Sequence, residues 1–213
     1  MSRLLLWPAG RSFTRAHSHE FGSTEFDARA DVDARFSPLY IAGELTPVLY
    51  AGADDLTAAA ETIFRRLPDR GRPRRVWLDR YRAWHWSQVH ARRDLRLLPL
   101  DARLAGADRL VDGDPATYPS ARTEATRLLR VHPEADGFMW LSRQLHDHPS
   151  AASIEVDLAG VCLLLVGATR GRRAGVGRHD LTATHPVVPF ASSAGLERLD
   201  AIAEQLDVTV VRT

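Results

Sequence analysis

Residues 47–64 read PVLYAGADDLTAAAETIF and predict a buried strand followed directly by a helix. The apolar run at 47–53 is typical of a core strand, and Asp54 or Asp55 is placed to cap the helix that follows. Apolar residues then recur at helical spacing up to residue 67, and Pro68 is expected to end the helix. This strand–helix unit is the clearest structural signal in the chain.

Polar residues stand inside or beside these apolar elements. Arg35 precedes the strand in ARFSPLY, Tyr50 lies within it, Glu61 lies on the helix, and Ser142 ends the apolar segment DGFMWLS. A cation, an aromatic ring, a carboxylate and a hydroxyl in one cleft suit a ligand that carries phosphate and ribose. Helical periodicity alone places Glu61 at the flank of the apolar stripe, where a solvated glutamate is the more common outcome.

Composition is that of an ordinary globular protein. The chain has 213 residues, of which 45% are hydrophobic and 26% charged, so we expect one α/β domain spanning 1–213. The net charge of +1 gives no reason to expect a nucleic-acid or membrane partner. Cys162, the single cysteine, is expected to be a buried thiol, and no apolar stretch is long enough for a signal peptide or a membrane span. A cytoplasmic location is the simplest expectation.

The order of predicted elements favours a mixed α/β (α+β) fold with many strands and few helices. Because strands and helices do not alternate regularly, a doubly wound nucleotide-binding fold is not expected. The patterns predict strands at both ends of the chain, one strand over 74–86 and a strand pair or long edge over 152–167. Turns are expected over 101–117 and a loop over 170–190. Helices are expected over 120–132 and 192–208.

Two further patterns have competing interpretations. His17 with His19, and His146 with His148, have the alternation of metal ligands but lack a third ligand at a fixed spacing, so we expect no metal. An aromatic cluster consists of Trp77, Tyr81, Trp84 and Trp86, and arginines surround it. It is able to stack single-stranded nucleic acid, but a surface for a protein partner or for self-association, such as a homodimer, is favoured.

Arginine in RFSPL, tyrosine in PVLYAG, glutamate eleven residues later and serine in DGFMWLSRQ together resemble the RES domain. The segment FTRAHS resembles the opening strand of that family and makes Arg15 its further arginine. The resemblance extends over roughly residues 10–165. It leaves 166–213 as a loop with a C-terminal helix and strand.

The resemblance implies a fold related to ADP-ribosyltransferases and a toxin that degrades NAD at the nicotinamide–ribose bond, by phosphorolysis or hydrolysis. It also implies an Xre-like helix-turn-helix antitoxin that covers the cleft. Glu61 would then stabilise an oxocarbenium-like ribose, while Tyr50 would stack on nicotinamide. Arg15 and Arg35 would bind the diphosphate, and Ser142 would hydrogen-bond the nicotinamide end or a phosphate.

Two alternatives remain open at this stage. One is an ADP-ribosyltransferase that modifies a macromolecule, and the other is a non-catalytic binding module. Three positions depart from the family pattern: Ala16 stands where a second aromatic is common, and Ala34 and Phe36 flank Arg35 in place of glycine and tryptophan. These departures favour ligand binding over fast turnover.

Overall fold

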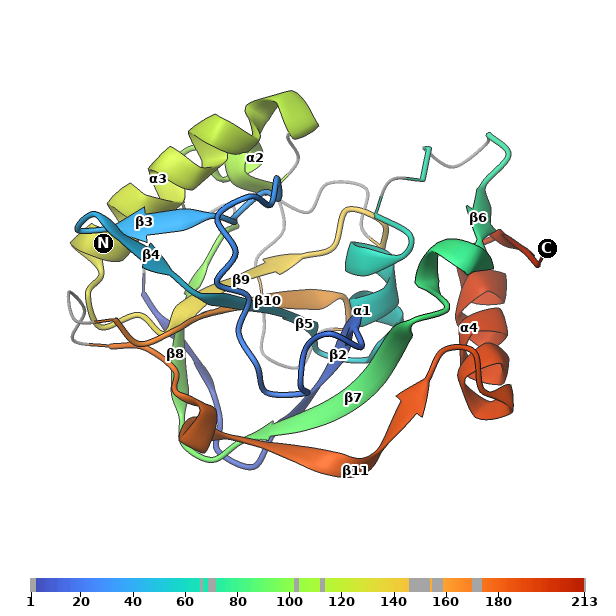
Figure 1. Ribbon diagram of the computed structural model, residues 1–213. Helices are drawn as coiled ribbons and strands as arrows, with labels where there is room; N and C mark the ends of the chain where they lie inside the picture. Colours follow the sequence, from blue (N-terminus) through green and yellow to red (C-terminus); the bar gives the residue numbers. More distant parts are fainter. Residues whose placement is uncertain are drawn as a thin grey trace.

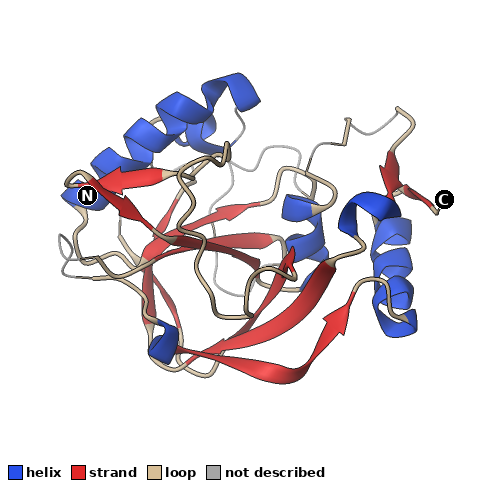
Figure 2. Cartoon of the chain, in the orientation of Figure 1, coloured by secondary structure: helices blue, strands red, loops and turns tan. Residues whose placement is uncertain are grey.

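The computed structural model describes residues 3–65, 67–68, 72–101, 104–111, 114–145, 154, 159–169 and 174–212. These residues form a mixed α/β fold built on one curled sheet, as the sequence predicts (Figures 1 and 2). The strands are β1 (Leu5–Trp7), β2 (Ser12–Ser18), β3 (Leu39–Ile41), β4 (Glu44–Thr46), β5 (Val48–Gly52), β6 (Arg75–Trp77), β7 (Trp84–Ala91), β8 (Leu95–Pro99), β9 (Gly137–Leu141), β10 (Val161–Val166), β11 (Leu181–Pro189) and β12 (Thr209–Val211). The helices are α1 (Asp55–Thr62), α2 (Ala107–Val111), α3 (Tyr118–Val131) and α4 (Ser193–Gln205), with 3₁₀ turns η1 (Leu78–Tyr81), η2 (Pro115–Thr117) and η3 (Arg178–Asp180).

The main sheet has the strand order β1-β8-β9-β10-β5-β2-β7-β11. The β8–β9 pair is parallel, and the other neighbouring strands are antiparallel. Two small sheets stand apart from it: β3 pairs with β4, and β12 pairs in parallel with β6. Helices α2 and α3 lie at one end of the molecule and α4 lies at the other (Figure 1).

The core follows from the apolar strands at the centre of the sheet. Every residue of β9 and β10 is buried, as expected for strands covered on both faces. One buried cluster joins these strands to α3, a second covers the other face, and a third lies between α1, α4 and β7. Cys162 is a buried free thiol in β10, as expected, and burial raises its pKa.

Helix α1 is seated directly on the sheet. The Asp54 side chain caps it by accepting a hydrogen bond of 2.7 Å from the Thr57 N–H. A Cβ added to Gly52 would lie 2.3 Å from the nitrogen of Ala58, so only glycine permits this approach. The helix ends at Thr62, before the predicted stop at Pro68. The chain leaves the helix there because the Phe64 N–H bonds to the Ala59 carbonyl, five residues back.

Four other predictions of secondary structure from the sequence were wrong. The expected strand over 74–86 is broken by η1, because β6 pairs with β12 outside the main sheet. Residues 181–189 form edge strand β11 on β7, and 107–111 form the short helix α2. The long edge expected over 152–167 is wrong, because residues 161–166 form the central strand β10. The alternative of a strand pair is not tested, since residues 152, 153 and 155–158 lie outside the described residues.

Candidate active site

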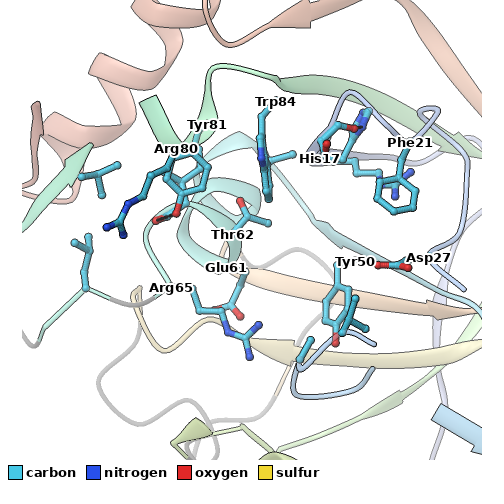
Figure 3. Close-up of a pocket in the computed structure, with 18 of the residues that line it drawn as sticks. His17, Phe21, Asp27, Tyr50, Glu61, Thr62, Arg65, Arg80, Tyr81 and Trp84 are labelled. Atoms are coloured by element: carbon cyan, nitrogen blue, oxygen red, sulfur yellow. Dashed lines mark hydrogen bonds between the residues drawn. The ribbon is translucent and has the colours of Figure 1, made fainter. Parts of the chain in front are cut away.

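A cavity of about 830 Å³ opens beside the end of α1 (Figure 3). Its walls come from β2 and the loop after it, from β5, from the end of α1 and from the β6–β7 segment. Of the predicted site residues, Arg15, Tyr50 and Glu61 line the cavity. Arg35 and Ser142 are buried and do not line it.

Glu61 and Ser142 are directly bonded. The Ser142 hydroxyl donates a hydrogen bond of 2.7 Å to Glu61 Oε1, and the Gln144 N–H lies 3.3 Å from Ser142 Oγ. Ser142 is fully buried at the end of β9, so it orients the carboxylate from behind, while the carboxylate itself reaches the cavity.

Tyr50 forms part of the cavity wall from the middle of β5. Its hydroxyl accepts a hydrogen bond of 2.9 Å from the Phe36 N–H, which holds the ring in place at the cavity. Burial raises the pKa of Tyr50 to about 12, although Arg65 and Arg35 oppose the shift. The phenol therefore stays neutral and keeps its O–H available to donate.

Arg35 lies behind the cavity wall. Its side chain is buried, and its Nε has no hydrogen-bond partner within the described residues. Burial lowers the pKa of Arg35, and the nearby Glu61 carboxylate opposes this shift. The Arg35 charge therefore lies near the Glu61 carboxylate, although Arg35 does not line the cavity.

Arg15 is anchored by the loop that follows β2. Its Nη1 donates to the carbonyls of Gly22 at 2.7 Å and Ser23 at 3.1 Å, and its guanidinium lies 6.0 Å from the centre of the Phe21 ring. Burial lowers the pKa of Arg15 to about 10, against the opposing carboxylates of Glu25 and Asp27. Arg15 therefore remains a cation at neutral pH, but one of its two terminal nitrogens already has structural partners.

Arg65 is a cation on the cavity that the sequence reasoning missed. It lies beside Glu61 in Figure 3, donates a hydrogen bond of 2.6 Å to the Tyr118 hydroxyl and stands over the Tyr118 ring at 5.1 Å. Its position four residues after Glu61 was the available signal, because that spacing places side chains on one side of a helix. In contrast, Arg29 lines the cavity but is paired through two hydrogen bonds with Asp27.

His17 was also missed as a cavity residue. Its Nδ1 lies 3.0 Å from the Ser18 carbonyl, which only accepts, so Nδ1 carries the proton and Nε2 accepts from Ser87 Oγ at 2.8 Å. Ser87 Oγ also lies 2.9 Å from Ser23 Oγ, which extends the hydrogen-bond chain to the loop held by Arg15. Burial, followed by the charge of Arg15, lowers the pKa of His17 to about 4, so the ring is neutral at physiological pH.

The aromatic cluster divides between core and cavity. Trp86 is buried and stacks on Phe190 at 4.5 Å, whereas Trp77, Tyr81 and Trp84 line the cavity. Trp77 keeps 46% of its surface exposed. The expected role of this cluster as a protein-partner or self-association surface stays a prediction.

Two groups of side chains face the cavity on either side of Glu61 (Figure 3). We call the first the Tyr50 end, formed by His17, Phe21, Asp27 and Tyr50. We call the second the Trp77 end, formed by Arg75, Trp77, Arg80 and Tyr81. In Figure 3, Glu61 and Thr62 lie between Arg80 and Tyr81 on one side and the Tyr50 end on the other, and Trp77 lies next to Arg80.

The histidine pairs that the sequence analysis weighed as possible metal ligands are described only in part. No three His, Cys, Asp or Glu side chains gather there in a way that could hold an ion. His146 and His148 lie outside the described residues. In the described part of the chain, no helix is both long and apolar enough to span a membrane.

The structure combines a curled mixed sheet with a glutamate and a serine that are hydrogen-bonded beside one cavity. The RES domain model matches residues 12–175, most of the chain, and the chain therefore belongs to the RES domain family. A chain in the crystal structure of the M. tuberculosis MbcT–MbcA toxin–antitoxin complex has a similar fold, with a TM-score of 0.55 and 13% sequence identity. The match covers 92% of this chain and 91% of that one. A comparison with curated proteins found no match.

Proposed function

We propose that this protein is the toxin of a toxin–antitoxin pair and that it cleaves the nicotinamide–ribose bond of NAD. The observation that carries the proposal is the bonded pair of Glu61 and Ser142 at a cavity that Tyr50 and Arg15 also line. Membership of the RES domain family and the similar fold in a toxin–antitoxin complex support it.

The cavity residues match the chemistry of this cleavage. The C1′–N1 bond of NAD breaks, its electron pair returns to the ring nitrogen, and neutral nicotinamide leaves. The ribose becomes oxocarbenium-like, and the fixed Glu61 carboxylate stabilises its positive charge or holds a ribose hydroxyl. An oxygen of phosphate or of water then bonds to C1′, and a water acceptor loses a proton.

The other residues position the substrate. The ring of Tyr50 provides a flat face for nicotinamide, and its hydroxyl is already held by the Phe36 N–H. Arg15 and Arg65 line the cavity as cations for the phosphate on the nicotinamide side of the dinucleotide. For Arg35 we propose a role behind the wall, as the buried cation whose charge attracts the Glu61 carboxylate and helps to orient it. Ser142 orients the same carboxylate.

NAD consumption by the purified protein tests the proposal. Wild type is expected to release nicotinamide, and Glu61→Gln to reduce the rate by about 100-fold or more. Glu204→Gln is the matched control, because Glu204 is exposed on α4 and does not line the cavity. Reactions with and without inorganic phosphate identify the acceptor by the product, which is either ADP-ribose or its phosphate ester.

Two results would replace the proposal by another function. Transfer of label from NAD to a protein would indicate an ADP-ribosyltransferase. Equal and negligible NAD loss in wild type and Glu61→Gln would indicate a non-catalytic binding module.

The proposed partner is a helix-turn-helix antitoxin of the Xre-like kind that covers the cavity mouth. Co-expression with such a protein encoded next to this chain is expected to relieve growth arrest and to block NAD loss in the purified complex. The proposed setting is the cytoplasm, where NAD is available.

A further inference from the structure

The Trp77 end of the cavity has no role in breaking the bond, yet it is built as a binding surface. In β6, Arg75 and Trp77 are exposed and Val76 is buried, and all three residues line the cavity. Arg80 follows on η1, and its guanidinium lies 5.9 Å from the centre of the Trp77 ring. A flat ring and two cations therefore line the same cavity.

These cations differ from the arginines of the described chain that are paired with carboxylates. Arg29, Arg93, Arg122, Arg127 and Arg198 each form an ion pair with a carboxylate. Among the described residues, neither Arg75 nor Arg80 has a carboxylate within ion-pair distance, and both are exposed. Their charges are available to an anion that enters the cavity.

The segment β6–η1, which carries these side chains, is held by hydrogen bonds to other parts of the chain. β6 pairs in parallel with β12, which lies beyond the region matched by the RES model. Buried Arg74 donates to the Leu206 carbonyl and to Gln144 Oε1, and the Tyr81 hydroxyl lies 3.3 Å from the Ile63 carbonyl. The last contact joins η1 to the turn after α1. The Trp77 end therefore keeps a fixed position relative to Glu61.

We propose that the Trp77 end is the specificity site for the adenosine diphosphate half of the dinucleotide, with Trp77 stacking on the base and Arg80 and Arg75 binding phosphate. This inference rests on the proposed function. Glu61 lies between the Tyr50 end and Arg80 of the Trp77 end, so a dinucleotide with nicotinamide at the Tyr50 end places its adenosine half at the Trp77 end (Figure 3). A cavity of about 830 Å³ is larger than nicotinamide and one ribose require.

Binding of ADP-ribose, measured by titration calorimetry, tests the site without any turnover. Wild type is expected to bind, Trp77→Ala to weaken the affinity about tenfold, and Trp77→Phe to weaken it about twofold, because a phenyl ring still stacks. Arg80→Gln is expected to weaken binding about fivefold and to reduce its salt dependence. Tyr40→Ala and Arg82→Gln are the controls, since both residues are exposed and neither lines the cavity.

Kinetics separates this inference from the proposed function. Trp77→Ala is expected to raise the KM for NAD about tenfold with kcat within about twofold, and to leave the turnover of nicotinamide mononucleotide unchanged. If wild type cleaves NAD but Trp77→Ala and Arg80→Gln keep its KM and the ADP-ribose affinity, this inference alone is overturned. Absence of ADP-ribose binding by wild type also overturns it. Absence of NAD cleavage with ADP-ribose binding intact overturns the proposed function and leaves the binding site in place.

Discussion

The Ser142 hydroxyl donates a hydrogen bond of 2.7 Å to Glu61 Oε1, joining two residues that are 81 positions apart in the chain. Strand β9 ends at Leu141 and helix α1 ends at Thr62, so the contact forms where two separate elements terminate at the same side of the sheet. The bond fixes the one carboxylate that we assign to chemistry.

Ser142→Ala removes this bond and leaves the fold otherwise intact. We expect kcat for NAD cleavage to fall about 10- to 100-fold, because a hydrogen bond to a charged group contributes about 1.5–3 kcal/mol. The measurement is nicotinamide release at saturating NAD. Ser120→Ala, on the exposed side of α3, is the control and should match wild type. A Ser142→Ala enzyme with wild-type kcat would contradict an orienting role.

Tyr50→Phe and Tyr50→Ala separate the two functions of the tyrosine. Phe is expected to lower the free energy of unfolding by about 1–3 kcal/mol, because the buried Phe36 N–H loses its acceptor, while the KM for NAD changes little. Ala is expected to lower stability further and to raise KM as the stacking face is lost. Urea unfolding and steady-state kinetics measure the two effects. Equal KM values for both variants would argue against stacking.

His17 predicts a pH dependence of stability. In the unfolded chain His17 binds a proton near pH 6.5, whereas in the fold its pKa is about 4. Between these values the unfolded state holds more protons, so the free energy of unfolding falls as pH drops from about 6.5 to 4. We expect this residue to account for a loss of about 1–3 kcal/mol.

His17→Gln supplies the comparison for that dependence. Urea unfolding of both proteins at several pH values between 4 and 7 should give a flatter profile for the variant. Parallel profiles for wild type and His17→Gln would show that other groups cause the loss.

Gly52→Ala tests whether the close packing of α1 against β5 requires glycine at this position. The new Cβ would lie 2.3 Å from the Ala58 nitrogen, so helix or strand must shift, and we expect a loss of about 3 kcal/mol in the free energy of unfolding. Gly22→Ala is the control, because its Cβ would meet only ordinary contacts, with Glu25 Oε2 at 3.5 Å. The control should stay within about 0.5 kcal/mol of wild type. Equal stability of the two variants would mean that the close approach is not required.

Local patterns were sufficient for the elements that depend on local physics. Asp54 caps α1, Ser192 caps α4, and both signals are readable from the sequence. The strand at 74–86 was wrong because its break depends on pairing of β6 with β12, more than 130 residues away. Strand β11 was missed for a similar reason, since an edge strand in a segment rich in turn residues is stabilised by its partner β7.

The candidate site also depends partly on local sequence patterns and partly on packing between distant segments. The sequence by itself determined the mixed α/β class and the strand–helix unit at 47–64, because residue type and spacing carry that information. The set Arg15, Arg35, Tyr50, Glu61 and Ser142 came from the resemblance to the RES domain and stays a prediction. Only the tertiary structure decided that Glu61 faces the cavity while Ser142 and Arg35 lie behind it. Only the tertiary structure also joined Trp77 and Arg80 to the same cavity. Which side of a wall a polar side chain occupies depends on packing between distant segments, and no local pattern encodes it.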